Sequence, residues 1–371
     1  MKKANKTLQK EFIRPLLKWY RQHARTLPWR ETSDPYSIWV SEIMLQQTQV
    51  ATVIPYWERW MKTLPTISAL ADASADQIHK LWEGLGYYRR VRLMQKAAIF
   101  IQENHHGTFP EDFEAILALP GIGPYTAGAI SSIAFDKPSP ILDGNVMRVL
   151  TRVYGIQKNP KESTCQKGLW ELSRSWVQQA HLLIPRKRHD CSHLNQALME
   201  LGATVCLPNQ SAKCDQCPIR KKCKAYELKI VSALPNLPQR RSNVFVHRLV
   251  LVIKSQGKFM IQKPKANEHN SGMCEFFNFQ VQKTKKGKLT PEMVQEELSQ
   301  RGMEYQGLSH LLTLKHTITH HRITLHCFTI TQCLDSKTNP EDTLWCTKRQ
   351  IEMAAMPSAH QKIRRAVLDK L

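Results

Sequence analysis

The sequence predicts a mostly helical N-terminal region followed by a smaller α+β domain. Before residue 224, apolar residues recur at helical spacing, as at Ile13, Leu16 and Tyr20. After a stretch with two prolines and little periodicity, runs rich in Val, Ile and Thr favour strands. We therefore divide the chain into a helical domain, a linker and an α+β domain, at residues 1–228, 229–243 and 244–371.

Local signals place several elements in order along the chain. Residues 74–77 fit a capping box ahead of Ile78. Residues 110–112 open a helix that ends near Gly121, and Pro124 occupies the first turn of the next helix. In the C-terminal region we expect strands at 244–253, 258–262 and 317–330, and a helix at 292–301.

The charge and composition narrow the class of protein. The 371 residues carry a formal net charge of +22, of which residues 230–371 contribute +10. No apolar run approaches the ~18 residues that span a bilayer, and the N-terminal MKKANKTLQK lacks the apolar segment of a secretory signal. We expect a cytoplasmic protein with a polyanionic partner, and favour nucleic acid over a membrane surface.

Four of the ten cysteines are clustered, with the spacing Cys206-x7-Cys214-x2-Cys217-x5-Cys223. Four thiolates so close in sequence can hold one metal centre. Two paired CxxC knuckles would favour zinc, whereas a single CxxC with uneven outer gaps favours a [4Fe–4S] cluster. Zinc remains the alternative. The same loop is rich in Lys and Arg, which predicts a phosphate-contacting patch or a solvated basic face.

Residues 119–128 (LPGIGPYTAG) predict two helices joined by a Gly-x-Gly turn. Gly121 and Gly123 would let backbone N–H groups approach a phosphate at the start of the second helix. Such a contact is independent of base sequence. The alternative is an ordinary tight turn between helices.

Two carboxylates are candidates for catalysis. Glu42 lies in an almost wholly apolar stretch, where burial would raise its pKa and make it a general acid; alternatively it lies on an exposed stripe of its helix. Asp143 precedes an apolar run and could instead be a helix N-cap. A protonated acid and an ionised carboxylate together suit cleavage of a glycosidic bond.

These motifs resemble the helix-hairpin-helix DNA glycosylases with an iron–sulfur loop, and within them the MutY-type adenine DNA glycosylases. The resemblance covers about residues 24–223. It is carried by the segments LPWR (27–30), SEIMLQQTQV (41–50), GLGYY (84–88), LPGIGPYTAGAI (119–130), ILDGNVMRVL (141–150) and NQALMELG (195–202). It implies a six-helix barrel with an iron–sulfur loop subdomain, followed by a Nudix-like lesion-recognition domain.

The resemblance implies a DNA repair enzyme that excises adenine mispaired with 8-oxoguanine or G. Glu42 would protonate N7 of the flipped adenine, and Asp143 would stabilise the sugar cation. Tyr125 and Asn145 would support the Asp143 carboxylate. Because the base must leave the stack, the resemblance also assigns a set of DNA contacts. Gln47 and Tyr87 would wedge into the duplex, Thr48 and Leu85 would lie near 8-oxoguanine, and Arg30 and Gln196 would touch the adenine.

Residue 125 separates the main interpretation from its nearest alternative. Endonuclease III-type relatives, which also cut the strand, have a lysine there for Schiff-base chemistry and lack the acid at Glu42. We therefore expect a monofunctional glycosylase with little or no lyase activity. The alternatives are an endonuclease III-like pyrimidine glycosylase with lyase activity and a non-catalytic iron–sulfur DNA-binding protein.

The C-terminal domain departs from the family pattern. It has no Nudix box of clustered glutamates, so we expect no nucleotide hydrolysis there. The family's Phe-Ser-His loop is Ile318-Thr319-His320, in which Thr319 and His320 keep polar contacts but Ile318 lacks an aromatic face. A zinc site made from His316, His320, His321 and His326 is an alternative, but alternation between strand faces and a solvated strand edge explain these histidines better.

The resemblance also implies the partners. We expect a monomeric bacterial protein that is associated with the nucleoid through duplex DNA holding A:8-oxoguanine or A:G pairs. Replication or mismatch-repair proteins are further candidate partners, and no membrane is expected.

Overall fold

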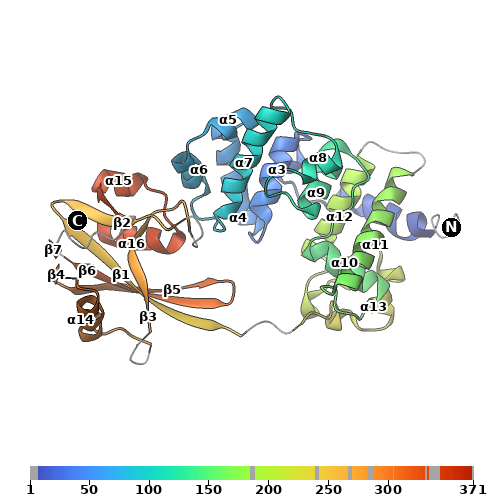
Figure 1. Ribbon diagram of the computed structural model, residues 1–371. Coiled ribbons are helices and arrows are strands. Elements are labelled where there is room, and N and C mark those ends of the chain that lie inside the picture. Colours follow the sequence, from blue (N-terminus) through green and yellow to red (C-terminus); the bar gives the residue numbers. More distant parts are fainter. Residues whose placement is uncertain are drawn as a thin grey trace. The chain divides into compact units, whose positions relative to one another are not determined.

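The structure is a computed structural model that describes most of the chain (Figure 1). The described residues are 7–183, 189–238, 242–265, 270–282, 287–303, 305–330, 332–333 and 343–369. Within them, no helix combines the length and the apolar character needed to cross a membrane.

The chain forms two compact units. The first contains residues 1–72 and 93–239, and the second contains residues 73–92 and 240–371. The second unit therefore takes a segment from the middle of the predicted helical domain, so the division differs from the predicted one. The physical reason is local packing: Glu83 accepts a hydrogen bond from the Met356 backbone N–H at 2.8 Å and faces Arg364 Nη2 at 3.6 Å.

The predicted linker is partly docked on the first unit. Leu234 is buried, and its carbonyl accepts a hydrogen bond from Arg152 Nε at 2.9 Å. The Asn236 amide donates to the Gln157 carbonyl at 3.1 Å. Residues 239–241 lie outside the described residues, so the linker prediction is not tested there.

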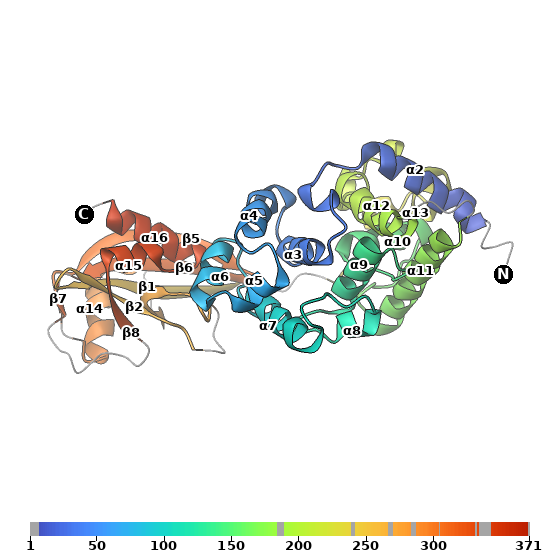
Figure 2. The same ribbon diagram turned by 90° about the horizontal axis from the view of Figure 1, so that it is seen from above.

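The first unit is helical, as predicted. Its helices are α2 (Arg14–His23), α3 (Pro35–Leu45), α4 (Val50–Thr63), α5 (Ile67–Asp72), α7 (Arg89–Asn104, which begins in the second unit), α8 (Phe113–Leu117), α9 (Pro124–Phe135), α10 (Gly144–Tyr154), α11 (Ser163–His181), α12 (Asp190–Thr204) and α13 (Lys224–Glu227). A π-helical turn (Gln9–Ile13) precedes α2. Helices α2 and α9–α12 enclose one apolar core, in which α12 is central (Figure 2).

Capping side chains fix several helix starts. Asp34 accepts hydrogen bonds from the backbone of Tyr36 and Ser37 at the start of α3. Asp112 caps α8, so that helix begins at Phe113, three residues later than the sequence suggested. Ser74 caps α6 (Ala75–Trp82) by accepting from the Gln77 N–H, which is the N-cap half of the predicted capping box.

The second unit is built on a six-stranded sheet with the order β5-β6-β1-β3-β2-β8. Strands β1 and β6 are parallel, and the other pairs are antiparallel. The strands of this sheet are β1 (Val244–Ser255), β2 (Lys258–Gln262), β3 (Glu275–Val281), β5 (Ser309–Ile318), β6 (His321–Ile330) and β8 (Thr343–Thr347). The short strands β4 (Tyr305–Gln306) and β7 (Gln332–Cys333) pair separately.

Helices cover both faces of this sheet (Figures 1 and 2). The predicted helix at 292–301 is α14 (Pro291–Gln300), which packs on one face. Helices α15 (Lys348–Met353) and α16 (Ser358–Leu368) follow β8, and their apolar residues pack on the other face. The single strand predicted at 317–330 is wrong, because the chain turns at Thr319 and His320 and forms the β5–β6 hairpin.

Candidate active site

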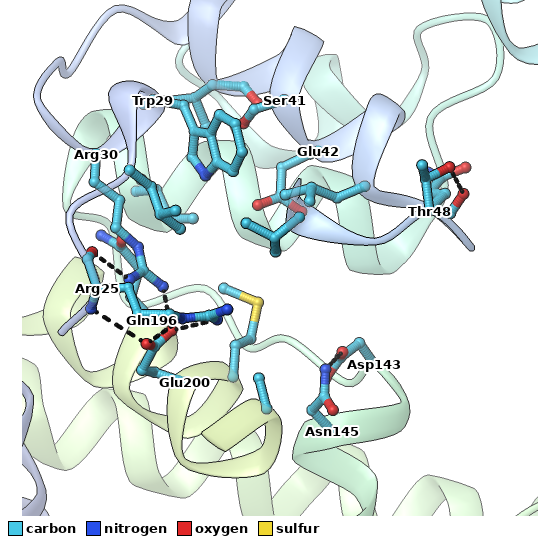
Figure 3. A pocket seen from close by; sticks show the side chains of 18 of the residues that line it. Arg25, Trp29, Arg30, Ser41, Glu42, Thr48, Asp143, Asn145, Gln196 and Glu200 are labelled. Carbon is cyan, nitrogen blue, oxygen red and sulfur yellow. Dashed lines mark hydrogen bonds and ion pairs between the residues drawn. The ribbon is translucent and has the colours of Figure 1, made fainter. Parts of the chain in front are cut away.

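A pocket of about 520 Å³ opens in the first unit between α3, α9, α10 and α12 (Figure 3). Its lining brings together eight of the residues singled out from the sequence: Arg30, Glu42, Gln47, Thr48, Tyr125, Asp143, Asn145 and Gln196. Its volume lies within the range typical of small-molecule sites. Figure 3 shows Glu42 on one wall, with an arginine–glutamate cluster and Asp143 at two other sides of the cavity.

Glu42 is buried on α3, so the interpretation as an exposed-stripe residue is wrong. Its exposed fraction is 6%, and every residue of α3 from Tyr36 to Met44 is buried. Burial raises the pKa of Glu42 to about 7, and the nearby charge of Asp143 adds to the effect. Hydrogen bonding from Tyr125 and the Arg30 charge act in the opposite direction. Glu42 therefore holds a proton for much of the time near neutral pH.

Asp143 is half-buried and is the N-cap of α10. Its Oδ1 accepts from the Val146 N–H at 2.7 Å, and its Oδ2 accepts from the Asn145 side-chain amide at 2.8 Å. Asp143 thus caps α10 and also lines the pocket. Two donors on one carboxylate suit an anionic group.

The hydrogen bond of Tyr125 goes to Glu42 and not to Asp143, the residue assigned to it from the sequence. Its hydroxyl donates to Glu42 Oε2 at 2.7 Å and lies 3.3 Å from Met199 Sδ. The reason is that α9 packs directly against α3, so the phenol reaches Glu42. Burial raises the pKa of Tyr125 well above its ordinary value, and the neighbouring Glu42 and Asp143 raise it further. Only Asn145, of the two residues expected to support Asp143, donates to it.

Arg30 is held by a carboxylate that sequence reasoning missed. Glu200, which is 1% exposed, accepts from Arg30 Nη2 at 2.8 Å and from Arg25 Nε and Nη2 at 2.6 and 2.9 Å. Burial opposes ionisation of Glu200, but the hydrogen bonds and charges of the two arginines lower its pKa to about 2. The available signal was an acidic residue in the apolar stretch 194–202, like that of Glu42.

Gln196 is also fixed by protein partners. Its Oε1 accepts from the Tyr20 hydroxyl at 2.8 Å, and its Nε2 donates to Ser192 at 3.0 Å. The Arg30 guanidinium lies 5.5 Å from the Tyr20 ring centroid. Arg30 and Gln196 therefore line the pocket as parts of a preorganised network rather than as free side chains.

The residues assigned to duplex contacts lie in both units. In the first, Gln47 is exposed with a φ of 59°, and Thr48 is half-buried. In the second, Tyr87 is 45% exposed with a φ of 50°, whereas Leu85 and Tyr88 are buried. Positive φ is uncommon for residues other than glycine, and here it accompanies exposure of both proposed wedges. The neighbouring Tyr88 packs in the core instead.

The Gly-x-Gly turn joins α8 to α9 as predicted. Gly121 has a φ of +78°, and a Cβ there would come within 2.6 Å of Leu93 Cβ, so glycine is required. Gly123 precedes α9, and a Cβ there would meet open space. The backbone before Pro124 is therefore accessible at a helix N-terminus, as a phosphate contact needs.

Thr319 and His320 lie in the second unit, at the tip of the β5–β6 hairpin. Thr319 has a φ of 54°, and its hydroxyl donates to the Ile318 carbonyl at 2.7 Å. Of the histidines considered for zinc, His326 is buried, and its Nε2 lies 3.1 Å from His247 Nδ1.

The four clustered cysteines converge beside α10. None forms a disulfide. Burial raises the pKa of the thiols of Cys214, Cys217 and Cys223. The Cys206 thiol raises these three pKa values further, so it lies close enough to affect the ionisation of each. Over the described ranges, no three His, Cys, Asp or Glu side chains are arranged for a single metal ion.

Arg152 is a buried cation that lies against the loop of the four cysteines. Its side chain is 1% exposed and donates to Cys206 Sγ at 3.4 Å and to the Leu207 carbonyl at 2.6 Å. In the part of the chain that the structure describes, no carboxylate pairs with it. Because a buried charge needs a partner of opposite sign, Arg152 fits an anionic, thiolate-bound centre.

Comparison with known families finds two matches along the chain. Residues 40–175 match the HhH-GPD superfamily of base excision DNA repair proteins, and residues 248–366 match the NUDIX domain. A thermostable thymine-DNA glycosylase of known structure is similar to the chain, with a TM-score of 0.53 and 28% identity over 61% of this chain and 99% of that one. The fold is therefore that of a helix-hairpin-helix glycosylase joined to a Nudix-like domain.

Curated relatives narrow the class further. The chain is 37% identical over 266 residues to the adenine DNA glycosylase of Buchnera aphidicola from Acyrthosiphon pisum, covering 69% of this chain and 71% of that protein. It is 46% identical over 239 residues to the adenine DNA glycosylase of Rattus norvegicus, covering 61% and 44%. The chain belongs to the adenine DNA glycosylase family. Its matched part spans less than half the length of the rat protein.

Proposed function

We propose that the protein excises adenine paired with 8-oxoguanine, or with G, from duplex DNA by hydrolysis of the N-glycosidic bond. The observation that carries this proposal is Glu42, whose carboxyl is buried with a pKa of about 7 and lines the same pocket as Asp143. A glycosidic bond breaks through an oxocarbenium-like state, for which an acid and an anion are the required pair.

The proposed reaction uses these groups in sequence. Glu42 donates its proton to N7 of the extruded adenine, and the C1′–N9 electron pair leaves with the base. The cation that remains on the sugar is stabilised by the Asp143 carboxylate, transient covalent attachment being one form of this. Water then adds at C1′ and loses a proton, which restores the acid. Asn145 orients Asp143, and Tyr125 orients Glu42.

The arginine–glutamate cluster would receive the base. Glu200 fixes Arg25 and Arg30 through three hydrogen bonds between side chains, so their positions are set before substrate arrives. Preorganised polar groups strengthen discrimination because little reorganisation is left to oppose binding. Arg30 and Gln196 would contact the adenine. Gln47 and Tyr87 would fill the space left in the duplex, with Thr48 and Leu85 near the opposite base.

The pocket chemistry supports a monofunctional enzyme. Strand cleavage by a glycosylase of the lyase type begins with a lysine amine attacking C1′. None of the described residues that line the pocket is a lysine. Tyr125, at the discriminating position, is hydrogen-bonded to the acid and has a raised pKa.

We propose a [4Fe–4S] cluster held by Cys206, Cys214, Cys217 and Cys223. Bound there, it would tie the loop at 206–223 together and place its basic residues for phosphate contact. Arg152 would donate to the Cys206 thiolate. We further propose a monomer in the bacterial cytoplasm that is associated with the nucleoid through DNA. Replication or mismatch-repair proteins are candidate partners.

The deciding experiment is single-turnover base release from a duplex with one A:8-oxoguanine pair, read with and without alkali. We expect strand cleavage only after alkali. Cleavage without alkali would indicate lyase chemistry and favour an endonuclease III-like enzyme. Binding with no release would favour a non-catalytic iron–sulfur DNA-binding protein.

A further inference from the structure

Phe245 at the start of β1 is the most exposed large hydrophobic side chain in the described part of the chain, at 73%. A lone exposed apolar residue is common and requires no explanation by itself. Its setting distinguishes Phe245, because the strand register fixes which side chains stand beside it.

The register places Phe245 in a row with two exposed polar residues. Phe245 is opposite Arg322 on β6, and Arg322 is opposite Thr317 on β5. Residues paired across neighbouring strands point to the same face of a sheet. Arg322 is held there, since its Nε donates to Asn243 Oδ1 at 3.2 Å and its Nη1 to Thr317 Oγ1 at 2.6 Å.

The next row on this face continues the pattern. It consists of His247, Thr324 and Lys315, which are paired in the same way. Neither row contains an acidic side chain. Further along β1, this face is covered by α14, whose core begins at Leu249 and does not include Phe245. Of the second row, Lys315 is exposed, whereas His247 and Thr324 are half-buried. The two rows therefore present the exposed Phe245 ring among the cations of Arg322 and Lys315 and the hydroxyl group of Thr317.

The hairpin tip is attached to these two rows. The Val244 N–H donates to the His320 carbonyl at 2.9 Å, which joins β1 to the tip of the β5–β6 hairpin. The His320 and His321 rings lie 4.3 Å apart by their centroids. Phe245 thus neighbours the tip at which Ile318 supplies no aromatic face.

We propose that the row Phe245–Arg322–Thr317 is a DNA contact in which the Phe245 ring stacks on a base that the enzyme has unstacked. An aromatic ring among cations is the arrangement that binds exposed bases along a charged backbone. A protein partner would instead require a wider apolar centre. The inference rests on the proposed DNA substrate and gives the second unit its stacking residue.

The test is binding of the full chain carrying Glu42→Gln to a fluorescent duplex with one A:8-oxoguanine pair, measured by anisotropy over a salt series. We expect Phe245→Ala to weaken binding by about 5- to 100-fold, with an unchanged salt slope. Phe245→Trp should bind within about twofold of the parent. Arg322→Gln should reduce the salt slope by about one phosphate contact.

Met353→Ala is the matched control, because Met353 is 69% exposed on α15, away from this row. It should bind as the parent does. Binding by Phe245→Ala within twofold of the parent, or an equal loss in Met353→Ala, would overturn the inference. If the unmodified chain releases no adenine and Phe245→Ala still weakens binding, the proposed function fails and the DNA contact stands.

Discussion

The α3 wall and the α12 side of the pocket each bury one glutamate, with opposite results. Glu42 on α3 is 6% exposed and Glu200 on α12 is 1% exposed. Burial raises the pKa of Glu42 to about 7, whereas the two arginines outweigh burial and lower the pKa of Glu200 to about 2. Burial alone does not determine the charge of a carboxyl group; the partners determine it.

The comparison separates two tasks within one cavity. The Glu42 carboxyl meets a phenol, which donates one hydrogen bond and carries no charge. The Glu200 carboxylate meets two guanidinium groups, each with a full charge. The first group can give up a proton near neutral pH, and the second stays ionised and holds the arginines in place. Glu42→Gln therefore removes the proton donor, whereas Glu200→Gln removes the charge that holds the two arginines.

The largest expected effect is on catalysis. Glu42→Gln should lower single-turnover adenine release by about 10²- to 10⁴-fold, the range for loss of a general acid, while DNA binding is retained. In the unmodified chain the rate should be flat below pH 7 and fall as the pH rises above about 7, because the protonated form is the donor. Retained cleavage by Glu42→Gln would remove Glu42 from the mechanism.

The second-largest expected effect is on the stability of the fold, when Glu200 loses its charge. Glu200→Gln should lower the free energy of unfolding at pH 7 by about 3 kcal/mol, since its pKa falls from 4.5 to about 2 on folding. This contribution is present above pH 4.5 and is lost as the pH falls towards 2. Urea denaturation at pH 7 and pH 3 measures it. Glu227→Gln, which removes an exposed pair with Lys224, is the control and should change stability little.

Glu42→Gln should affect stability in the opposite direction. A carboxyl whose pKa is raised on folding opposes folding as it ionises, so the substitution should have no effect below pH 4.5. Its stabilisation should grow between pH 4.5 and 7 and reach at most about 3 kcal/mol above pH 7. Thermal unfolding of both chains at pH 4 and pH 8 compares them. A Glu42→Gln chain that is less stable at pH 8 would contradict the raised pKa.

The smallest effect concerns Tyr125. Its hydroxyl donates to Glu42 and favours the ionised form. Tyr125→Phe should therefore raise the pKa of Glu42 and shift the falling limb of the pH–rate profile upwards by about one unit, the worth of one hydrogen bond. Met199→Leu, which leaves the phenol in place, should keep the limb where it is. A downward shift in Tyr125→Phe would assign the hydroxyl another role.

Local patterns predicted much of the fold because their causes are local. Pro124 at the start of α9 and the Ser74 cap of α6 follow from backbone chemistry within a few residues. The β5–β6 hairpin was missed because its turn at Thr319 and His320 has neither glycine nor proline. Thr319 adopts a positive φ there, which a threonine side chain does not predict.

Glu42 shows where pattern reasoning ends. Helix α3 is apolar on nearly all sides, so periodicity could not say whether its one acidic residue faced solvent or a cavity. Tyr125 was assigned to Asp143 by resemblance, and only the packing of α9 on α3 directs it to Glu42. Glu200 lay in a recognised motif, but its two arginine partners are 170 and 175 residues away in the chain.

The sequence by itself determined the division into helical and α+β regions, helix starts such as those of α6 and α9, the cysteine spacing and the types of groups available for chemistry, because these depend on neighbouring residues. The tertiary structure decided which carboxyl group is protonated, which residues fix it and which face of the sheet leaves Phe245 exposed. Those outcomes depend on distances between residues far apart in the chain, and the pKa shifts and side-chain hydrogen bonds of the site arise only when folding sets those distances.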